Sequence, residues 1–216
     1  MNYAAARHNM VESQVKTNSI VHEKLLDALR KIPRESFVPS KFQGVAYVDN
    51  PVPLDDGRFL MAPLDMARLI QEAKPTVTDL ALVIGCSTGY GAAVLSNMVG
   101  AVVGLESNAS LASDATEIFE ELCIDNVAVV AGDLSKGYPD QAPYDIIFFE
   151  GAIPNIPEQI SSQLAEGGRL VCVLSDEGID KAILCSLHSG NLSTRIIFES
   201  TLPMLPDFKK ETNFVF

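Results

Sequence analysis

The stretch from residue 79 to residue 98 constrains the fold of this chain most, because its hydrophobic period changes partway and glycines lie at the change. Residues 80–84 form an unbroken apolar run, which predicts a parallel strand buried on both faces. From Tyr90 to Met98 the apolar residues recur at helical spacing. Gly85 and Gly89 between them allow a sharp turn and a close approach to the backbone. This pattern predicts a nucleotide or nucleoside site.

A carboxylate downstream supports this prediction. Glu106 follows the apolar run 101–105 and lies 21 positions after Gly85. An acidic residue at about this spacing, at the end of the neighbouring strand, can accept hydrogen bonds from both ribose hydroxyls. The glycine turn alone is weaker evidence, because many strand-to-helix turns contain glycine for steric reasons. At Gly89 in particular, tight packing without a ligand is the alternative.

Length and charge limit the classes of protein and partner. At 216 residues the chain fits one α/β domain, with a helical and loop extension over residues 1–60 and a cofactor-binding core over residues 61–216. The net charge of −12 argues against binding to nucleic acid or to anionic membranes. We therefore expect a polypeptide or small-molecule partner. The sequence leaves the oligomeric state open.

The cysteines and histidines indicate neither disulfides nor a metal site. None of the cysteines has C-x-x-C spacing, so we expect four free thiols at Cys86, Cys123, Cys172 and Cys185. His8 and His22 are expected to be exposed or capping histidines. No apolar run reaches about 18 residues, and the first residues lack the apolar segment of a signal peptide. These features predict a cytoplasmic protein.

The N-terminal part is predicted to be helical and then irregular. Apolar spacing predicts helix over residues 5–31, broken near residues 17–19, with an oxygen-bearing side chain capping the second half. Residues 42–59, with a turn at 55–57, are typical of loops and short strands. We expect this loop near the carboxyl edge of the sheet. A helix follows over residues 61–71, with Pro63 in its first turn.

The rest of the chain alternates between strand and helix patterns, as βαβ units do. The predicted elements are a helix at 111–122, strands at 127–131 and 144–149, a loop at 150–154, a short helix reaching 164, a turn at 166–168 and a strand at 169–174. Strands at 182–187 and 194–200 have links too short for a parallel crossover and must run antiparallel. The apolar residues 213–216 are expected to dock on the core or complete a sheet edge, with dimerisation as an alternative.

The residues also resemble the protein-L-isoaspartate O-methyltransferase family, which methylates isomerised aspartate using S-adenosylmethionine. The resemblance covers roughly residues 10–169. Matching stretches in family order are Arg34-Glu-Ser-Phe-Val-Pro39, Gly57, Ala62-Pro63, Ala67, Ile84-Gly-Cys-Ser-Thr-Gly-Tyr90, Ala92-Ala-Val-Leu95, Glu106, Asp125-Asn-Val127, Gly132-Asp133, Ala142-Pro-Tyr-Asp145, Gly151-Ala152, Ile156-Pro157, Gln163-Leu164 and Glu166-Gly-Gly-Arg-Leu170. The resemblance implies a Rossmann-like S-adenosylmethionine-dependent methyltransferase fold. That fold is a mostly parallel sheet with helices on both faces and an antiparallel C-terminal hairpin.

Carried over by position, the resemblance implies a cofactor site. Gly85 and Gly89 would pass the methionine part of S-adenosylmethionine, Glu106 would hold the ribose, and Asp133 would meet the adenine. The cofactor-binding candidates are Gly85, Ser87, Gly89, Glu106, Gly132 and Asp133. The catalytic residues stay unknown, and Phe59, Met61 and Ala152 are candidates for positioning the substrate.

Three departures from the family pattern bear on activity. Val83 stands where the family usually has an acidic residue, and Ser87 where it has a middle glycine, so we expect reduced cofactor affinity. Residues 59–61 read Phe-Leu-Met where the family presents hydroxyls to its substrate. The hypotheses are therefore a methyltransferase acting on an isoaspartyl or another carboxylate, and a non-catalytic module that keeps the fold. A nicotinamide-dependent oxidoreductase is disfavoured, because the glycine turn lacks G-x-G-x-x-G.

Overall fold

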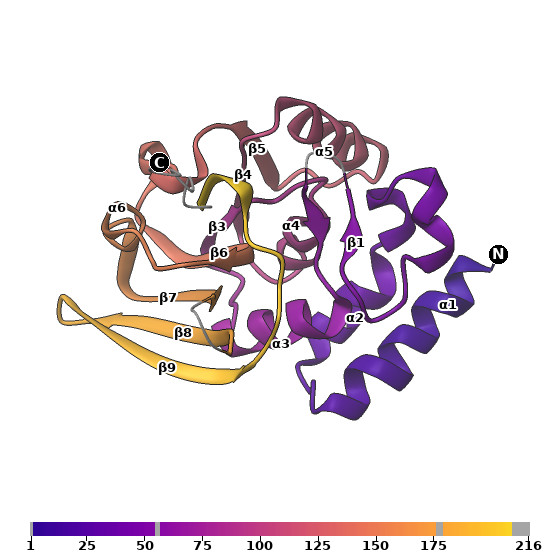
Figure 1. The fold of residues 1–216 in the computed structure, drawn as a ribbon, viewed down its shortest axis with the longest axis horizontal. Helices are drawn as coiled ribbons and strands as arrows, with labels where there is room; N and C mark the ends of the chain where they lie inside the picture. The colour runs from indigo at the N-terminus through magenta and orange to yellow at the C-terminus, as the bar shows by residue number, and fades with distance from the viewer. Residues whose placement is uncertain (1, 55–56, 176–178, 209–216) are drawn as a thin grey trace, which may run out of the picture.

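A seven-stranded sheet forms the centre of the protein (Figure 1). The computed structural model describes residues 2–54, 57–175 and 179–208. The strand order is β5-β4-β3-β6-β7-β8-β9. The strands are β3 (Leu80–Ile84), β4 (Ala101–Glu106), β5 (Val127–Ala131), β6 (Tyr144–Ile153), β7 (Leu164–Leu174), β8 (Lys181–His188) and β9 (Asn191–Glu199). The strands β5, β4, β3, β6 and β7 are parallel to one another. Strand β8 runs antiparallel to β7, and β9 runs antiparallel to β8. The predicted parallel sheet with a C-terminal hairpin is confirmed.

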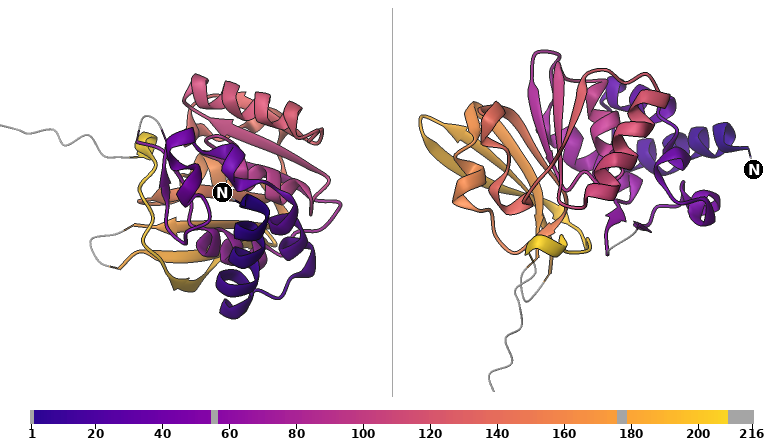
Figure 2. Two further views of the ribbon diagram at one scale, coloured as in Figure 1. Left: turned by 90° about the vertical axis from the view of Figure 1, so that its right-hand side faces the viewer. Right: turned by 90° about the horizontal axis from the view of Figure 1, so that it is seen from above.

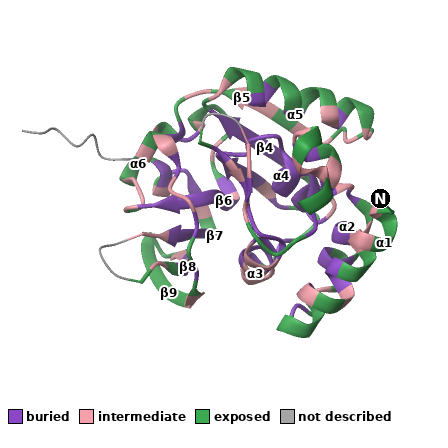
Figure 3. Ribbon diagram, turned by 45° about the vertical axis from the view of Figure 1, so that its right-hand side comes forward, coloured by how far each residue is buried: buried purple, intermediate pink, exposed green. Residues whose placement is uncertain are grey.

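The two faces of the sheet are covered differently. The longer helices α2 (Glu23–Lys31), α3 (Pro63–Ala73), α4 (Tyr90–Ser96) and α5 (Ala109–Glu121) lie on one face. The other face carries the short elements α6 (Glu158–Ser161), η5 (Leu134–Lys136) and η6 (Pro139–Gln141). Successive strand residues point to opposite faces. Val83 therefore packs in the hydrophobic core on the side of α2 to α5, and Ile84 in the core on the side of α6 and η5. The central strands are consequently buried, while α5 is exposed on its outer surface (Figure 3).

The N-terminal segment breaks where the sequence predicts. It consists of α1 (Tyr3–Asn9), the π-helical η1 (Met10–Val15) and η2 (Lys16–Asn18). Ser19 then adopts a left-handed conformation with φ 65° before α2 begins. The predicted side-chain cap on the second helix is wrong: the cap residue His22 makes no such bond. The side-chain oxygen of Gln71 instead accepts the backbone N–H groups of Val21 and His22.

Short elements connect this segment to the sheet. These are η3 (Arg34–Phe37), η4 (Ser40–Val45), β1 (Val52–Pro53) and β2 (Phe59–Leu60), and the last two pair antiparallel. Of the predicted turn at 55–57, Asp55 and Asp56 lie outside the described residues, and Gly57 has φ 69°. The N-terminal helices and the β8–β9 hairpin lie at opposite sides of the molecule (Figure 2).

Two predicted loops belong to strands instead. Residues 150–153 continue β6, because Ala152 and Ile153 pair with Val173 and Leu174 of β7. Residues 166–168 lie within β7 beside an irregular register, and Gly167 there has φ 77°. The expectation for residues 213–216 falls outside the described residues. None of the helices in the described ranges is both long and apolar enough to cross a membrane.

Candidate active site

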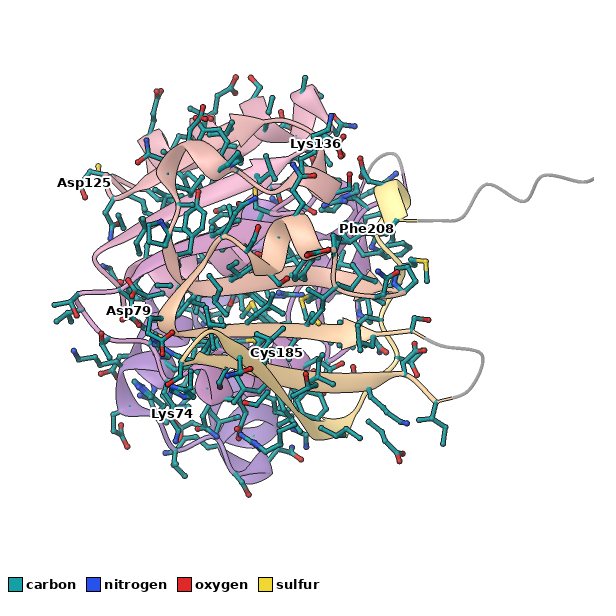
Figure 4. The ribbon with its side chains drawn as sticks, turned by 90° about the vertical axis from the view of Figure 1, so that its left-hand side faces the viewer. Lys74, Asp79, Asp125, Lys136, Cys185 and Phe208 are labelled. Carbon is teal, nitrogen blue, oxygen red and sulfur yellow. The ribbon has the colours of Figure 1, made fainter. Side chains whose placement is uncertain are left out.

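Three neighbouring strands are aligned at one level of the sheet, at or near their carboxyl ends. Ile84 of β3 pairs with Leu105 of β4 on one side and with Phe149 of β6 on the other. The next residue of each strand, Gly85, Glu106 and Glu150, therefore lies at what we call the carboxyl edge. In Figure 4, Asp79 and Asp125, which precede β3 and β5, lie at the opposite edge from Lys136 and Phe208. Ligands of open α/β folds bind at this carboxyl edge.

The turn after β3 has left-handed backbone at three positions. Gly85, Ser87 and Gly89 have φ angles of 75°, 52° and 94°. Glycine adopts this conformation freely, whereas a serine there costs about 1–2 kcal/mol. The conformation of Ser87 directs its backbone N–H to Oε2 of Glu106, at 2.7 Å. The turn thus orients the carboxylate that the sequence assigns to ribose binding.

Gly89 is explained by packing. A Cβ atom at this position would lie 2.9 Å from Cε1 of Phe119, which belongs to α5. The structure therefore leaves no room for a side chain at Gly89, as the sequence predicts. The neighbour that fills the space is an aromatic ring of the chain itself.

Glu106 is fully buried and uses both of its oxygens. Oε2 accepts hydrogen bonds from the Ser87 N–H and from Nη2 of Arg58, the latter at 2.8 Å. Oε1 accepts from the backbone N–H of Asn108 at 3.0 Å. The pair of Arg58 and Glu106 is a buried ion pair, with side chains 3% and 0% exposed. Such pairs are sensitive to the loss of either partner.

Arg58 is a site residue that the sequence did not identify. It follows Gly57, in the loop expected near the carboxyl edge, and its partner lies 48 positions away in the chain. Its Nε and Nη1 atoms are buried and have no hydrogen-bond partner among the described residues. A Cβ atom at Gly85 would lie 2.7 Å from Nη2 of Arg58. The guanidinium therefore lies directly over the glycine turn.

The segment after β9 also covers this turn. It returns across the carboxyl edge to η7 (Pro206–Phe208), as the yellow trace in Figure 1 shows. The backbone of Ala152 donates to the Pro203 carbonyl at 3.0 Å and accepts from the Leu205 N–H at 2.9 Å. Cδ2 of Leu205 would lie 2.9 Å from a Cβ atom at Gly85. Ala152, a candidate for holding substrate, thus uses its backbone groups to hold this segment.

Glu150 is a second buried acid at the carboxyl edge. Glu150 is only 3% exposed, and no side chain in the described ranges forms a hydrogen bond or an ion pair with it. Burial raises the pKa of Glu150 to about 8, against the smaller lowering effect of Arg58. Glu150 and Arg58 line one cavity of about 10 Å³, together with Met61 and residues 202–206.

The predicted substrate-positioning strand is apolar on the site side. Met61 is 3% exposed, lines the small cavity and has its carbonyl held by Arg34. Phe59 lines the same cavity and is half-buried. Arg34 itself is fully buried, with its guanidinium 4.8 Å from the ring centre of Tyr90. Burial lowers the pKa of Arg34.

The adenine candidates lie after the next strand. The N–H of Gly132, after β5, donates to the carbonyl of Glu106 at 2.9 Å. Asp133 is partly exposed and accepts from the backbone and hydroxyl of Ser135, and it pairs with Lys136 at 3.0 Å. The hydroxyl of Ser135 and the Lys136 ammonium lower the pKa of Asp133. The structure thus places Gly132 and Asp133 one strand beyond Glu106.

The sequence and the fold have known counterparts. The family model described as "Protein-L-isoaspartate(D-aspartate) O-methyltransferase" matches residues 5–195. The chain belongs to this family. A protein-L-isoaspartate O-methyltransferase of Koribacter versatilis is 35% identical over 190 residues, which are 88% of this chain and 86% of that protein. Protein-L-isoaspartate O-methyltransferase 2 of Archaeoglobus fulgidus is 35% identical over 195 residues, covering 89% of each chain.

Solved structures of protein-L-isoaspartate O-methyltransferases have the same fold. One superposes with a TM-score of 0.80 at 27% identity, over 92% of this chain and 65% of that chain. This chain therefore spans slightly less than two thirds of that solved chain. A Plasmodium falciparum structure, described as a complex with S-adenosyl-L-homocysteine, gives a TM-score of 0.78 at 19% identity, over 96% and 99% of the two chains.

The residues of the carboxyl edge fit a nucleoside cofactor in their chemistry. A buried carboxylate on β4 accepts hydrogen bonds, as ribose hydroxyls require, and Gly85 provides a cradle beside it. In this conformation Arg58 and Leu205 fill the cradle. A cofactor placed against Gly85 would therefore have to displace both side chains.

Proposed function

We propose that this protein binds S-adenosylmethionine at the carboxyl edge and transfers its methyl group to a carboxylate. The fully buried Glu106, beside the left-handed turn at Gly85, is the observation that carries the proposal. In the bound state Glu106 holds the ribose, and residues 132–133 face the adenine. The cofactor supplies an electrophilic methyl group on a positively charged sulfur.

The residues needed for such a reaction are few. A carboxylate acceptor is already ionised at pH 7, so no base has to remove a proton from it. The rate then depends on proximity and alignment with the methyl group, together with exclusion of water. β2 and the segment at residues 202–206 cover the carboxyl edge and can supply that exclusion. The candidate acceptor is the isomerised aspartate that gives the family its name, in a damaged cytoplasmic protein.

A second candidate function follows from the apolar strand. Phe59 and Met61 line the cavity without a hydroxyl, so they favour an acceptor with an apolar group beside its methylated atom. The same feature is compatible with a module that binds the cofactor and transfers nothing. Both alternatives keep the cofactor site; the first changes the acceptor, and the second has no transfer.

One paired experiment distinguishes these functions. Tritiated S-adenosylmethionine is incubated with the protein and either an isoaspartyl peptide or an unfractionated cell extract, and labelled product is counted. Label on the peptide supports protein repair, and label only in the extract supports another acceptor. Cofactor binding by calorimetry with no label in either mixture supports the binding module. Absence of cofactor binding contradicts the proposal.

A further inference from the structure

Two buried acids flank the glycine turn. Neighbouring strands lie about 4.8 Å apart, and β3 runs between β4 and β6. Because Ile84 pairs with both Leu105 and Phe149, Glu106 and Glu150 follow on the two sides of Gly85. Both acids are at most 3% exposed. A buried carboxyl is costly unless a partner compensates it. The space over Gly85 is therefore suited to a cation.

The chain places a cation of its own in that space. Nη2 of Arg58 lies 2.8 Å from Oε2 of Glu106 and directly over Gly85. Arg58 also shares the small cavity with Glu150. Two of the guanidinium nitrogens make no hydrogen bond to any described residue. Arg58 thus compensates the negative charge beside Gly85, but two of its nitrogen atoms donate no hydrogen bond to a described residue.

The chain also makes room for the carboxyl of Glu150. A Cβ atom at Gly91 would lie 2.7 Å from Cδ of Glu150. Gly91 is inside α4, where glycine costs about 1 kcal/mol relative to alanine. The glycine accommodates a buried acid that no side chain in the described ranges pairs with. The Ala92 backbone N–H bonds to this carboxyl, but Oε1 has no hydrogen-bond partner among the described residues, and a cation beside it would compensate the buried oxygen.

S-adenosylmethionine has a cation at the matching place. Its sulfur is joined to the ribose through one carbon, so a ribose on Glu106 leaves the sulfonium about one strand spacing away, towards Gly85 and Glu150. We propose that the Arg58 guanidinium and the cofactor sulfonium are alternative cations for this one position, and that Glu150 makes it select the charged cofactor over the neutral demethylated product. This inference depends on the proposed function.

The reaction removes the charge that Glu150 recognises. In the transfer the S–CH₃ bond breaks with its electron pair left on sulfur, and the acceptor carboxylate oxygen provides the pair for the new O–CH₃ bond. Sulfonium and acceptor charges disappear together, leaving a neutral thioether. Arg58 can then return to Glu106, which favours release of the product. The site therefore distinguishes the two ends of the reaction by charge.

The protonation state of Glu150 depends on the groups around it and on the charge of the bound ligand. The groups facing it are Arg58 from the loop before β2, Glu106 from β4, Arg34 from η3, and Cys86 and the Ala92 N–H from the turn and α4. Burial raises the pKa of Glu150 to about 8, so at pH 7 most of the carboxyl is protonated in the free chain. A sulfonium beside it favours the ionised form, whereas a thioether does not.

The test compares ligands that differ in charge. S-adenosylmethionine, S-adenosylhomocysteine and sinefungin, an inert analogue with an ammonium-bearing carbon in place of the sulfonium, are titrated calorimetrically into the unmodified protein and its variants. The variants are Glu150→Gln, Glu150→Asp and Arg58→Gln, with the exposed Glu120→Gln on α5 as the control. Thermal unfolding checks that each variant is folded.

Glu150→Gln is expected to weaken binding of the two cationic ligands by about tenfold and to leave S-adenosylhomocysteine within about twofold. Glu150→Asp keeps the charge and should keep part of the preference, which also covers the case in which the glutamine variant does not fold. Arg58→Gln should strengthen binding of S-adenosylhomocysteine, because no guanidinium then competes for Glu106. Glu120→Gln should change nothing.

Two outcomes overturn the inference in different ways. If Glu150→Gln weakens all three ligands equally, or Arg58→Gln weakens S-adenosylhomocysteine, the charge selection is wrong while cofactor binding stands. If neither the unmodified protein nor any variant binds any of the three ligands, the proposed function fails as well.

Discussion

Arg58 and Glu106 form a buried ion pair across 48 residues of sequence, with Nη2 and Oε2 2.8 Å apart. In the proposed function the same carboxylate holds the ribose of the cofactor. Cofactor binding would then exchange Arg58 for the ribose hydroxyls as partners of Glu106.

The first prediction concerns Glu106→Gln. A neutral amide loses the charge-assisted hydrogen bonds to the ribose hydroxyls, so cofactor binding should weaken by about 1.5–3 kcal/mol, or roughly 10- to 150-fold. Calorimetric titration with S-adenosylhomocysteine measures this change. Unchanged affinity in a folded variant would show that the ribose is held elsewhere.

The second prediction concerns the stability of the ion pair. Arg58→Gln leaves the buried carboxylate of Glu106 with two backbone donors and no cation, so the free energy of unfolding should fall by about 3–5 kcal/mol. Urea denaturation provides the measurement. Arg195→Gln is the matched control, because Arg195 pairs with Glu72 in an exposed position and should contribute at most about 1 kcal/mol. Equal effects of the two variants would contradict the buried pair.

How far the sequence predicts this structure depends on the range of the interactions. The strands β3, β4 and β5 agree with their apolar runs, because burial between two layers demands such runs. Glu106 was found by its spacing from Gly85. Arg58 was missed, because nothing local in a loop marks an arginine whose partner lies on a distant strand. No sequence rule identifies such a contact before the topology is known.

Glu150 was missed for a different reason. The apolar run ends at Phe149, so an acid after it predicts the start of a loop, whereas pairing with β7 continues β6 through residue 153. The signal was nevertheless present. An acid directly after an apolar strand is the same pattern that identified Glu106, and here it lacked only the spacing from the glycine turn.

The third prediction is a pH dependence of stability that arises from Glu150. Its pKa is about 8 in the folded chain and about 4.5 unfolded, so between these values the folded state binds more protons. The stabilising contribution of the protonated carboxyl is complete below pH 4.5 and is lost as pH rises towards 8. The free energy of unfolding of the unmodified protein, relative to Glu150→Gln, should therefore decrease by a few kcal/mol across this window. Urea unfolding at several pH values tests this, and parallel curves for both proteins would contradict it.

The fourth prediction concerns Gly89. Substitution by valine places side-chain atoms against the Phe119 ring and forces a β-branched residue into left-handed backbone, so thermal stability should fall by several degrees. If packing is the whole role of Gly89, cofactor affinity in the folded fraction stays unchanged. Phe119→Leu in the same chain should recover part of the loss. Reduced affinity at unchanged stability would show that the cofactor passes Gly89.

The last prediction is that the unmodified protein methylates isoaspartyl peptides more slowly than a relative that carries the hydroxyls. By the family resemblance, Phe59 and Met61 take positions where hydroxyls are expected, and both line the small cavity beside Arg58 and Glu150. A polar substrate group that enters without its hydrogen-bond partner loses about 1–3 kcal/mol, which lowers the rate about 5- to 150-fold for each missing bond. The double variant Phe59→Thr, Met61→Ser should therefore raise kcat/KM for methylation of an isoaspartyl peptide, measured by transfer of a tritiated methyl group. The double variant Phe59→Leu, Met61→Leu changes the shape of the cavity lining without adding a hydroxyl and serves as the control.

If the unmodified protein is as active as a relative that carries the hydroxyls, other groups hold the substrate. The backbone of Ala152, once the segment at residues 203–205 has moved away, is then the nearest candidate.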